Sequence, residues 1–519
     1  MRRNWLIGGV AALSLLTAGV LVLSGCGGSG GPVSAPETGP APSVSAQFLQ
    51  ILPAAQTNAN YVGSDKCLTC HNDNYHAGWK LTKHGQVGTG CEQCHGPGGL
   101  HVANRTATPA VVAADILSMN NGASGHLVDD PIVCGQCHGP TYSQYMNSRH
   151  SGVIEDVITA AHSNPLGEAT CLRCHSNAVK TKFINGPWTQ GLLAGTPVPT
   201  IQNAADTALS ALTADQITGF VNVTHNSANC VTCHDPHTKT GKLTSDGEDF
   251  HLRRSTFSTD VTPVLPGSPA KVNTNFDHIC GTCHNTRGGK PDDVTIMTAG
   301  ATARPPVHEG PEFNMLNGLG GSLPVGTVIQ TSSHRDVPDQ CVHCHMPTAR
   351  HTFTVSLDTS CAPCHTATDA AAREGSVRNE VLNDLLILRT RMENWAKAHF
   401  ATAPSGWTGS TSDLWNYYTL ASTDPAQQAI SQSIQSQIPI TIRHARLNYW
   451  FIILDRSFGI HNTPYVRQLI DFSQSELDKA GVSRSVQIPS RAAGANIFKQ
   501  DVQKAILSEM LDGGYGMRN

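Results

Sequence analysis

The stretch Cys67-Leu-Thr-Cys70-His71 is the first of eight copies of one pattern, in which two cysteines are separated by two residues and followed directly by histidine. The eight copies use 16 of the 17 cysteines and leave only Cys26 outside the pattern. A disulfide framework or a set of zinc sites would not demand histidine at one fixed offset every time. The pattern is typical of covalent haem attachment, in which both thiols bond to the vinyl groups of one porphyrin and the histidine binds its iron.

We therefore predict eight covalently bound haem c groups, each with one iron. The attachment residues are Cys67, Cys70, Cys91, Cys94, Cys134, Cys137, Cys171, Cys174, Cys230, Cys233, Cys280, Cys283, Cys341, Cys344, Cys361 and Cys364. The proximal iron ligands are His71, His95, His138, His175, His234, His284, His345 and His365.

The composition offers little material for an ordinary hydrophobic core. Only 39% of the 519 residues are hydrophobic and 6% are aromatic, while 48 Gly and 30 Pro favour turns and irregular backbone. All eight copies lie between residues 67 and 365, so each haem is served by roughly 40 residues or fewer and neighbouring haems must pack together. We expect a mainly α fold with much irregular coil, in which a haem-packed core is followed by a C-terminal helical module. Stretches 178–224 and 285–333, rich in Gly, Pro and Thr, are predicted to run over the surface.

The remaining histidines supply candidates for the second axial ligand. Of the 25 histidines, 17 lie outside the eight proximal positions, roughly twice the number that eight irons need. The better candidates lie before, or just after, one of the eight copies. They are His84, His101, His150, His225, His237 and His334. Eight others are weaker ligand candidates: His76, His126, His162, His251, His278, His343, His399 and His444. Of these, His278 and His343 are expected to pack beside a haem, and His399 and His444 to form hydrogen bonds.

The N-terminus resembles an export signal. Two arginines precede an apolar stretch within residues 1–26, and that stretch ends in Leu-Ser-Gly-Cys26, which resembles the lipobox of bacterial lipoproteins. The alternative is an uncleaved transmembrane anchor, since the stretch is just long enough to span a bilayer. Residues 27–59 are predicted to be a flexible tether. We expect an exported protein, lipid-anchored through Cys26 in the outer membrane and facing the periplasm or the cell surface.

Two regions are expected after the tether. Residues 60–370 are predicted to be the octahaem cytochrome c domain. Residues 371–519 are predicted to be a helical module, because apolar residues recur at steps of three and four from Val377 to Trp395. Further helices are predicted near residues 440–456, 464–480 and 491–512.

The charge pattern limits the class of partner. The formal net charge is −4 and only 14% of residues are charged, so no basic patch suggests nucleic acid. Haem propionates would add up to about sixteen negative charges before pairing and protonation. An acidic particle of this kind favours cationic or metal-ion partners over anionic ones.

The later copies carry a resemblance to a known group. The stretch from Cys341 to Pro347, the Arg-His-Thr-Phe segment after it and the copy at Cys361 are similar to the later haem region of multihaem cytochromes such as ammonia-forming cytochrome c nitrite reductase and octahaem hydroxylamine oxidoreductase. Segment 455–465 resembles the helix junction that in this group returns a histidine to an earlier haem. The resemblance implies three further distal ligands: His308, His351 and His461.

The sequence departs from this group at its catalytic features. Nitrite reductases of the group attach the catalytic haem through a copy that ends in lysine, and no such copy occurs here. We also identify no counterpart of the tyrosine that crosslinks the catalytic haem of hydroxylamine oxidoreductase. The resemblance thus supports the architecture more than an enzyme activity.

Two functions of different class follow. The first is an electron carrier with two histidines on every iron, which passes electrons to other cytochromes, redox proteins, metal ions or oxides. The second is a reductase or dehydrogenase that acts on a small nitrogen or sulfur compound at one haem with an open coordination position. We favour the carrier. Storage of electrons, or a scaffold role in a larger cytochrome assembly, is not separated from it by the sequence.

Overall fold

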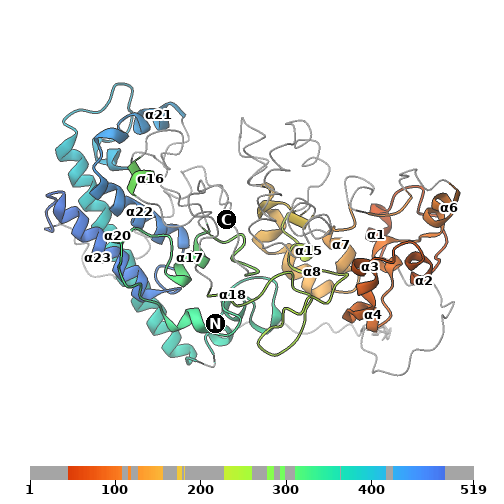
Figure 1. The fold of residues 1–519 in the computed structure, drawn as a ribbon. Helices are drawn as coiled ribbons and strands as arrows, with labels where there is room; N and C mark the ends of the chain where they lie inside the picture. The colour runs from red at the N-terminus through yellow and green to blue at the C-terminus, as the bar shows by residue number, and fades with distance from the viewer. Residues whose placement is uncertain are drawn as a thin grey trace, which may run out of the picture. The chain divides into compact units, whose positions relative to one another are not determined.

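Helices joined by irregular coil build the described parts of the chain, short ones in the haem-attachment region and long ones in the C-terminal region (Figure 1). The computed structural model describes residues 45–107, 115–118, 127–155, 172, 174–177, 180–181, 227–259, 278–285, 293–297, 310–362, 364–416 and 425–485. All of them belong to one compact unit, Ala41–Asn519. Within these ranges no β-strand occurs, and an isolated bridge pairs His234 with Leu252. The prediction of a mainly α fold with much irregular coil is confirmed.

The helices of the haem-attachment region are only one or two turns long. They are α1 Ala46–Ile51, α2 Ser64–Leu68, α3 Asn74–Gly78, η1 Trp79–Leu81, α4 Lys83–Gln86, α5 Cys91–His95, α6 Gly99–Ala107, α7 Pro131–Gly135, α8 Gly139–Met146, η3 Arg149–Gly152, α15 Cys230–Cys233, α16 Asp293–Met297, α17 Glu312–Asn317, η5 Ser333–Asp336, α18 Cys341–His345, η6 Pro347–Ala349 and α19 Leu357–Ser360.

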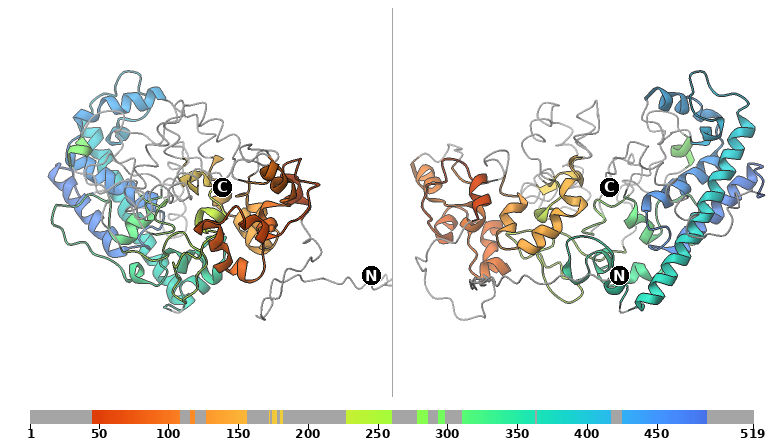
Figure 2. Two further views of the ribbon diagram at one scale, coloured as in Figure 1. Left: turned by 45° about the vertical axis from the view of Figure 1, so that its right-hand side comes forward. Right: turned by 180° about the vertical axis from the view of Figure 1, so that it is seen from behind.

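The C-terminal region contains the long helices. Its elements are α20 Ala367–His399, η7 Thr411–Trp415, α21 Pro425–Ser433, η8 Gln435–Gln437, α22 Ile440–Asp455 and α23 Thr463–Lys479. Helices α20, α22 and α23 pack against one another (Figure 2). The helices predicted near 440–456 and 464–480 are confirmed, whereas the one predicted near 491–512 lies outside the described residues.

Local signals explain where these helices begin. Thr366 caps α20, because its Oγ1 accepts a hydrogen bond from the backbone N–H of Asp369 at 3.2 Å. Asn462 caps α23 in the same way, and Pro464 occupies the first turn, where its missing N–H costs nothing. The predicted apolar stripe of α20 faces the core, with Leu388 fully buried.

Truncation of this stripe is expected to destabilise the C-terminal core. Leu388→Ala removes a fully buried side chain from the cluster that joins α20, α22 and α23. We expect a loss of about 2–5 kcal/mol in the free energy of unfolding, from lost burial and the cavity left behind. Urea unfolding followed by helical circular dichroism measures it. Asn383→Ala, at an exposed position of the same helix, is the control, and an equal shift in both variants would contradict the packing.

Residues 311–323 are mostly buried rather than superficial, whereas residues 324–326 and 328–330 are exposed. Phe313 and Met315 in α17 are both 1% exposed or less. Ser322 N–H donates to Asn448 Oδ1 at 2.7 Å, which ties the segment to α22. The prediction that the whole of 285–333 runs over the surface is therefore wrong for this part, because contacts with the C-terminal helices cover it. Stretch 178–224 lies outside the described residues, apart from two residues.

The folded region begins before residue 60. Helix α1 buries Phe48 and Ile51 in a small cluster with Val133. The Gln56 side chain donates to the carbonyl of His95 at 2.6 Å and is itself fully buried. The last part of the predicted 27–59 tether is thus ordered, and a tether would end by residue 44.

The predicted anchor, residues 1–26 with Cys26, lies outside the described residues. Among the helices that are described, every one is too short or too polar to cross a bilayer.

Candidate haem sites

One helical turn brings the cysteines and the histidine of a copy to the same side of the backbone. In α5 and α18 the whole copy is helical. The histidine N–H donates to the carbonyl of the first cysteine at 2.9–3.0 Å in the copies that end in His71, His138, His234, His284 and His365. This i to i+4 hydrogen bond closes a turn, and residues three and four positions apart then lie on one face. The spacing therefore directs both thiols and one imidazole toward the same group.

Cysteines of different copies lie next to one another. A hydrogen bond with Cys91 raises the pKa of Cys67, and a hydrogen bond with Cys230 raises the pKa of Cys134. These contacts join the first copy to the second and the third to the fifth. None of the described cysteines forms a disulfide, so each thiol is available for a thioether bond.

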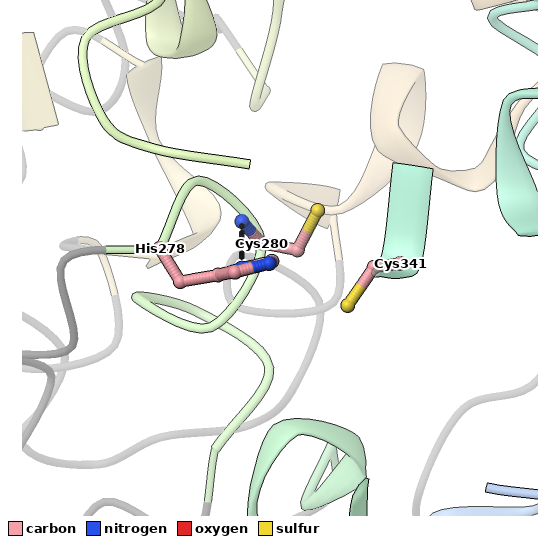
Figure 3. Close-up of side chains that lie close together, drawn as sticks. All are labelled: His278, Cys280 and Cys341. Atoms are coloured by element: carbon pink, nitrogen blue, oxygen red, sulfur yellow. Dashed lines mark hydrogen bonds between the residues drawn. The ribbon is translucent and has the colours of Figure 1, made fainter. Parts of the chain in front are cut away.

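The sixth and seventh copies meet in the same way (Figure 3). The ligand atoms of His278, Cys280 and Cys341 all lie within 4.8 Å of one another. His278 is fully buried, and its Nδ1 accepts hydrogen bonds from the backbone N–H groups of Cys280 and Gly281 at 3.1 and 3.0 Å. We therefore interpret His278 as a cap of the copy that begins at Cys280, in line with its expected place beside a haem.

The fourth copy adjoins the sixth. Cys174 Sγ approaches the carbonyl of Thr282 at 3.9 Å. The buried ammonium of Lys180 donates to Thr282 Oγ1 at 3.0 Å and contacts Cys283 Sγ at 2.9 Å. Two copies far apart in the sequence are thus held together by side chains within them.

Seven proximal histidines each face one of the predicted distal histidines. The ring centroids are 6.3 Å apart for His71 and His101, 6.1 Å for His95 and His237, 6.1 Å for His138 and His84, 6.3 Å for His234 and His351, 6.1 Å for His284 and His150, 6.2 Å for His345 and His461, and 6.5 Å for His365 and His334.

These separations fit two imidazoles that bind one metal ion from opposite sides. A metal–imidazole bond is about 2 Å long, so two such bonds in line separate the ring centroids by roughly 6 Å. Direct ring stacking would bring the centroids closer than this, as for Trp395 and His399 at 4.8 Å. The residues present therefore fit haem iron bound by two histidines.

Two other histidines lie at similar distances without belonging to such a pair. His76 is 5.9 Å from His237, and His251 is 6.1 Å from His84. Neither pair contains the histidine of an attachment copy, and the one such histidine beside His76, His71, lies closer than in the seven pairs, at 4.9 Å. The Nδ1 atom of His76 contacts Asp73 at 2.5 Å, and the Nε2 atom of His251 accepts the backbone N–H of Lys83 at 3.3 Å. Both histidines therefore form hydrogen bonds within the protein.

Hydrogen bonds at Nδ1 orient many of the facing rings. Backbone carbonyls contact the Nδ1 atoms of His95, His175, His234, His334, His345 and His351 at 2.7–3.2 Å. When Nδ1–H donates to an acceptor, the proton is fixed there and Nε2 is left with its lone pair for a metal ion.

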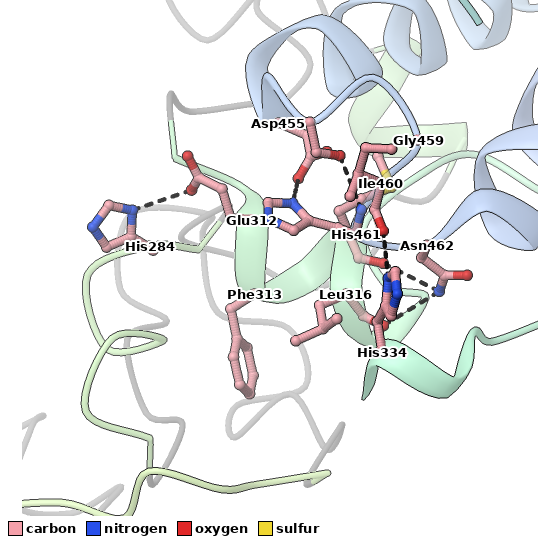
Figure 4. Close-up of polar contacts among 12 residues, drawn as sticks. His284, Glu312, Phe313, Leu316, His334, Asp455, Gly459, Ile460, His461 and Asn462 are labelled. Carbon is pink, nitrogen blue, oxygen red and sulfur yellow. Dashed lines mark hydrogen bonds and ion pairs between the residues drawn. The ribbon is translucent and has the colours of Figure 1, made fainter. Parts of the chain in front are cut away.

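Carboxylates take the place of the carbonyl at four rings. Nδ1 contacts a carboxylate oxygen at 3.0 Å between His101 and Asp115, 3.2 Å between His284 and Glu312, 3.1 Å between His365 and Asp369, and 2.7 Å between His461 and Asp455. Figure 4 shows two of them, with Glu312 on His284 and Asp455 on His461. The sequence analysis missed these acids. Only Asp369 has a local signal, because it follows His365 by four residues at the start of a helix.

The environment of several rings favours the neutral imidazole that binds metal. Burial lowers the pKa of His150 and of His234 to about 4, and that of His237 to about 3. At His284 burial also disfavours the cation, but the charge of Glu312 and its hydrogen bond raise the pKa to about 9. His284 beside its carboxylate and His234 beside a backbone carbonyl therefore have pKa values shifted in opposite directions.

Some predicted residues fall outside the described part of the chain. They are Cys171, His225 and His308 among the attachment and ligand candidates, together with His126 and His162 of the weaker group. The proximal His175 is described, and its Nδ1 lies 2.8 Å from the carbonyl of Val153.

Comparison with known proteins agrees with the attachment pattern. Residues 45–96 and 133–189 match the family described as cytochrome c554 and c-prime, and these two segments contain the first four copies. No curated protein matches the chain.

Two solved structures show a distant similarity to this chain. One is an undecahaem cytochrome from the S-layer of Carboxydothermus ferrireducens, with 16% identity over 85% of this chain and 72% of that one, and a TM-score of 0.48. The other is the outer cell wall cytochrome OcwA, with 17% identity over 75% of this chain and 70% of that one, and a TM-score of 0.42. The resemblance to nitrite reductase and hydroxylamine oxidoreductase is not tested by these comparisons and stays a prediction.

The attachment pattern, the local geometry that aligns its cysteines with a histidine, and the family match over the first four copies lead to one conclusion. The chain is a multihaem c-type cytochrome, an electron-transfer protein with covalently bound haem c.

Proposed function

We propose that this cytochrome carries eight haems, each iron bound by two histidines, and acts as an electron conduit without a catalytic iron. When bound, haem c supplies one-electron chemistry between ferric and ferrous iron. The chain's own contribution is to fix the positions of the axial imidazoles and to hold neighbouring copies close together.

The observation that carries this proposal is the set of seven imidazole pairs. In each pair one ring belongs to an attachment copy and the other comes from elsewhere in the chain. A five-coordinate iron needs one side free for substrate, whereas these pairs offer a ligand on both sides. This favours the carrier over a nitrogen or sulfur reductase.

The eighth iron would be bound by His175. Two distal candidates have no partner assigned above, His225 and His308. Both lie outside the described residues.

Contacts between copies support a continuous path. Gln136 Nε2 donates to the carbonyl of Gln93 at 3.2 Å, which links the third copy to the second. Helix α18, which is the seventh copy, packs against α19, which leads into the eighth. Together with the cysteine contacts described above, these links arrange the copies in two rows. We infer that one row runs from the first copy through the second and third to the fifth, and that the other runs from the sixth through the seventh to the eighth. The fourth copy lies beside the sixth. Thr232 Oγ1 donates to Asn177 Oδ1 at 2.7 Å, and this contact between the fifth and fourth copies joins the two rows.

We further propose that the protein is exported and anchored by a lipid on Cys26. Covalent haem c in so many copies and the N-terminal sequence pattern support this location. The physiological partners would be other redox proteins or cytochromes, with metal ions or oxides as terminal acceptors. The predicted division into a 60–370 haem domain and a 371–519 helical module belongs to the same proposal.

The test combines whole-protein mass with electron paramagnetic resonance. We expect the mature protein to carry eight covalent haems and to give only low-spin ferric signals, unchanged by nitrite, hydroxylamine or sulfite. Cys230→Ala/Cys233→Ala should lower the mass by the equivalent of one haem. Fewer than eight haems in the unaltered protein, or a high-spin signal that shifts with one of these compounds, would contradict the proposal.

A further inference from the structure

Two acids stand out among the groups that contact the axial imidazoles. Most of the contacted Nδ1 atoms face a neutral backbone carbonyl. At His284 and His461 the acceptor is the carboxylate of Glu312 or Asp455 (Figure 4). A full negative charge at the far nitrogen increases the basicity of a metal-binding imidazole and gives it imidazolate character.

The surroundings leave these two charges largely uncompensated by cations. The side chain of Asp455 is 0% exposed, and its other contact is the hydroxyl of Ser457. Glu312 is partly buried at the first position of α17 and contacts His284. In a buried setting a charge acts more strongly than in water, because solvent screens it less. Arg378, the cation that acts on His461, is itself 2.6 Å from Glu374.

The other two acids are offset by arginines. Asp369, beside His365, accepts from Arg373 Nε at 2.8 Å and is largely exposed. Asp115, beside His101, lies 3.8 Å from Arg105. An adjacent guanidinium cancels much of the field that the carboxylate exerts on an iron, so these two haems should be affected less.

We propose that Glu312 and Asp455 give the haems of the sixth and seventh copies the lowest reduction potentials in the chain. This rests on the proposed ligation of those irons by His284 with His150 and by His345 with His461. Negative charge and a more basic ligand both stabilise ferric over ferrous iron, which lowers the potential. Glu312 also acts electrostatically on His461, so the two acids reinforce each other.

The position of the sixth and seventh haems in the proposed path would let their low potentials affect electron flow. The sixth and seventh copies touch through Cys280 and Cys341, and the fourth copy adjoins the sixth. Two haems of low potential at this point would be the last to accept electrons and the first to lose them. They would act as an energetic step between the N-terminal haems and the eighth haem.

Spectroelectrochemical reduction of the holoprotein tests this inference. Glu312→Gln keeps a hydrogen-bond acceptor on His284 and removes the charge, and Asp455→Asn does the same on His461. Each variant should shift one component at the low-potential end of the reduction curve to higher potential. Asp369→Asn is the matched control, because its carboxylate is exposed and paired with arginine, and it should give a smaller shift elsewhere in the curve.

The same samples separate failure of this inference from failure of the proposed function. Haem content and low-spin resonance of the unaltered protein report on the ligation. If eight low-spin haems are present and both variants retain them, a low-potential end that does not move, or that moves no more than in Asp369→Asn, overturns the inference. Asp455 is buried, and the Asp455→Asn variant could lose haem. In that case the inference is tested by the potential shift in Glu312→Gln alone, because Glu312 is partly exposed.

Discussion

Replacing His150 by alanine is expected to convert one haem of the holoprotein from low spin to high spin. His150 faces His284 with ring centroids 6.1 Å apart, and the edge of Phe353 packs on its ring at 4.4 Å. Loss of the imidazole leaves the iron at the sixth copy with one protein ligand and a void on the other side. A five-coordinate or water-bound ferric haem is high spin, so a new high-spin resonance should appear while the other low-spin signals persist. Added imidazole should fill the void and restore the original spectrum.

The control for this experiment is another histidine that is not proposed to bind iron. His399 ends α20 and stacks on Trp395 at 4.8 Å, so His399→Ala should leave all haems low spin. The ligand assignment would be wrong if His150→Ala left the resonance unchanged. It would also be wrong if both alanine variants produced the same high-spin signal.

Withholding haem is expected to unfold the attachment region but not the C-terminal helices. The large hydrophobic cluster of the described residues draws nearly all its members from 381–477, whereas the cluster around Phe48 and Val133 is small. Between them the helices are only one or two turns long, and many polar side chains are buried. A segment of this composition cannot offset its conformational entropy unless the haems supply apolar surface.

Hydrogen exchange of the haem-free and haem-loaded proteins measures this difference. Amide protection across α5, α15 and α18 should fall by roughly 10³-fold or more when haem is absent, as expected for loss of a stable fold. Protection of α22, which is almost wholly buried, should change little and serves as the internal control. Equal protection of the attachment copies in both forms would contradict a core built from haem.

The attachment chemistry could be predicted from sequence because it is local. Two cysteines and a histidine within five residues fall on one side of a single helical turn, whatever the rest of the chain does. The C-terminal helices could also be predicted from local signals. The apolar periodicity of α20 extends over many residues, and Pro439 and Pro464 mark the starts of α22 and α23. Local sequence context also predicted most of the distal candidates, but it did not predict which haem each of them would bind.

The pairing of those candidates is a tertiary property. His237 faces His95, and His461 faces His345, across long stretches of intervening chain. No local pattern encodes such a separation, because it depends on how the connecting segments fold back. The same holds for Glu312 and Asp455, which only the folded chain brings to His284 and His461.

The sequence by itself predicted where haem is attached, which histidine is proximal and where the long helices lie, because each of these depends on neighbours within a few turns of backbone. Only the tertiary structure decided which second imidazole faces the histidine in seven of the attachment copies, which of these rings contact a carboxylate, and why residues 311–323 are buried. Axial ligation and charge act across space, and distance in space is set by packing rather than by order along the chain.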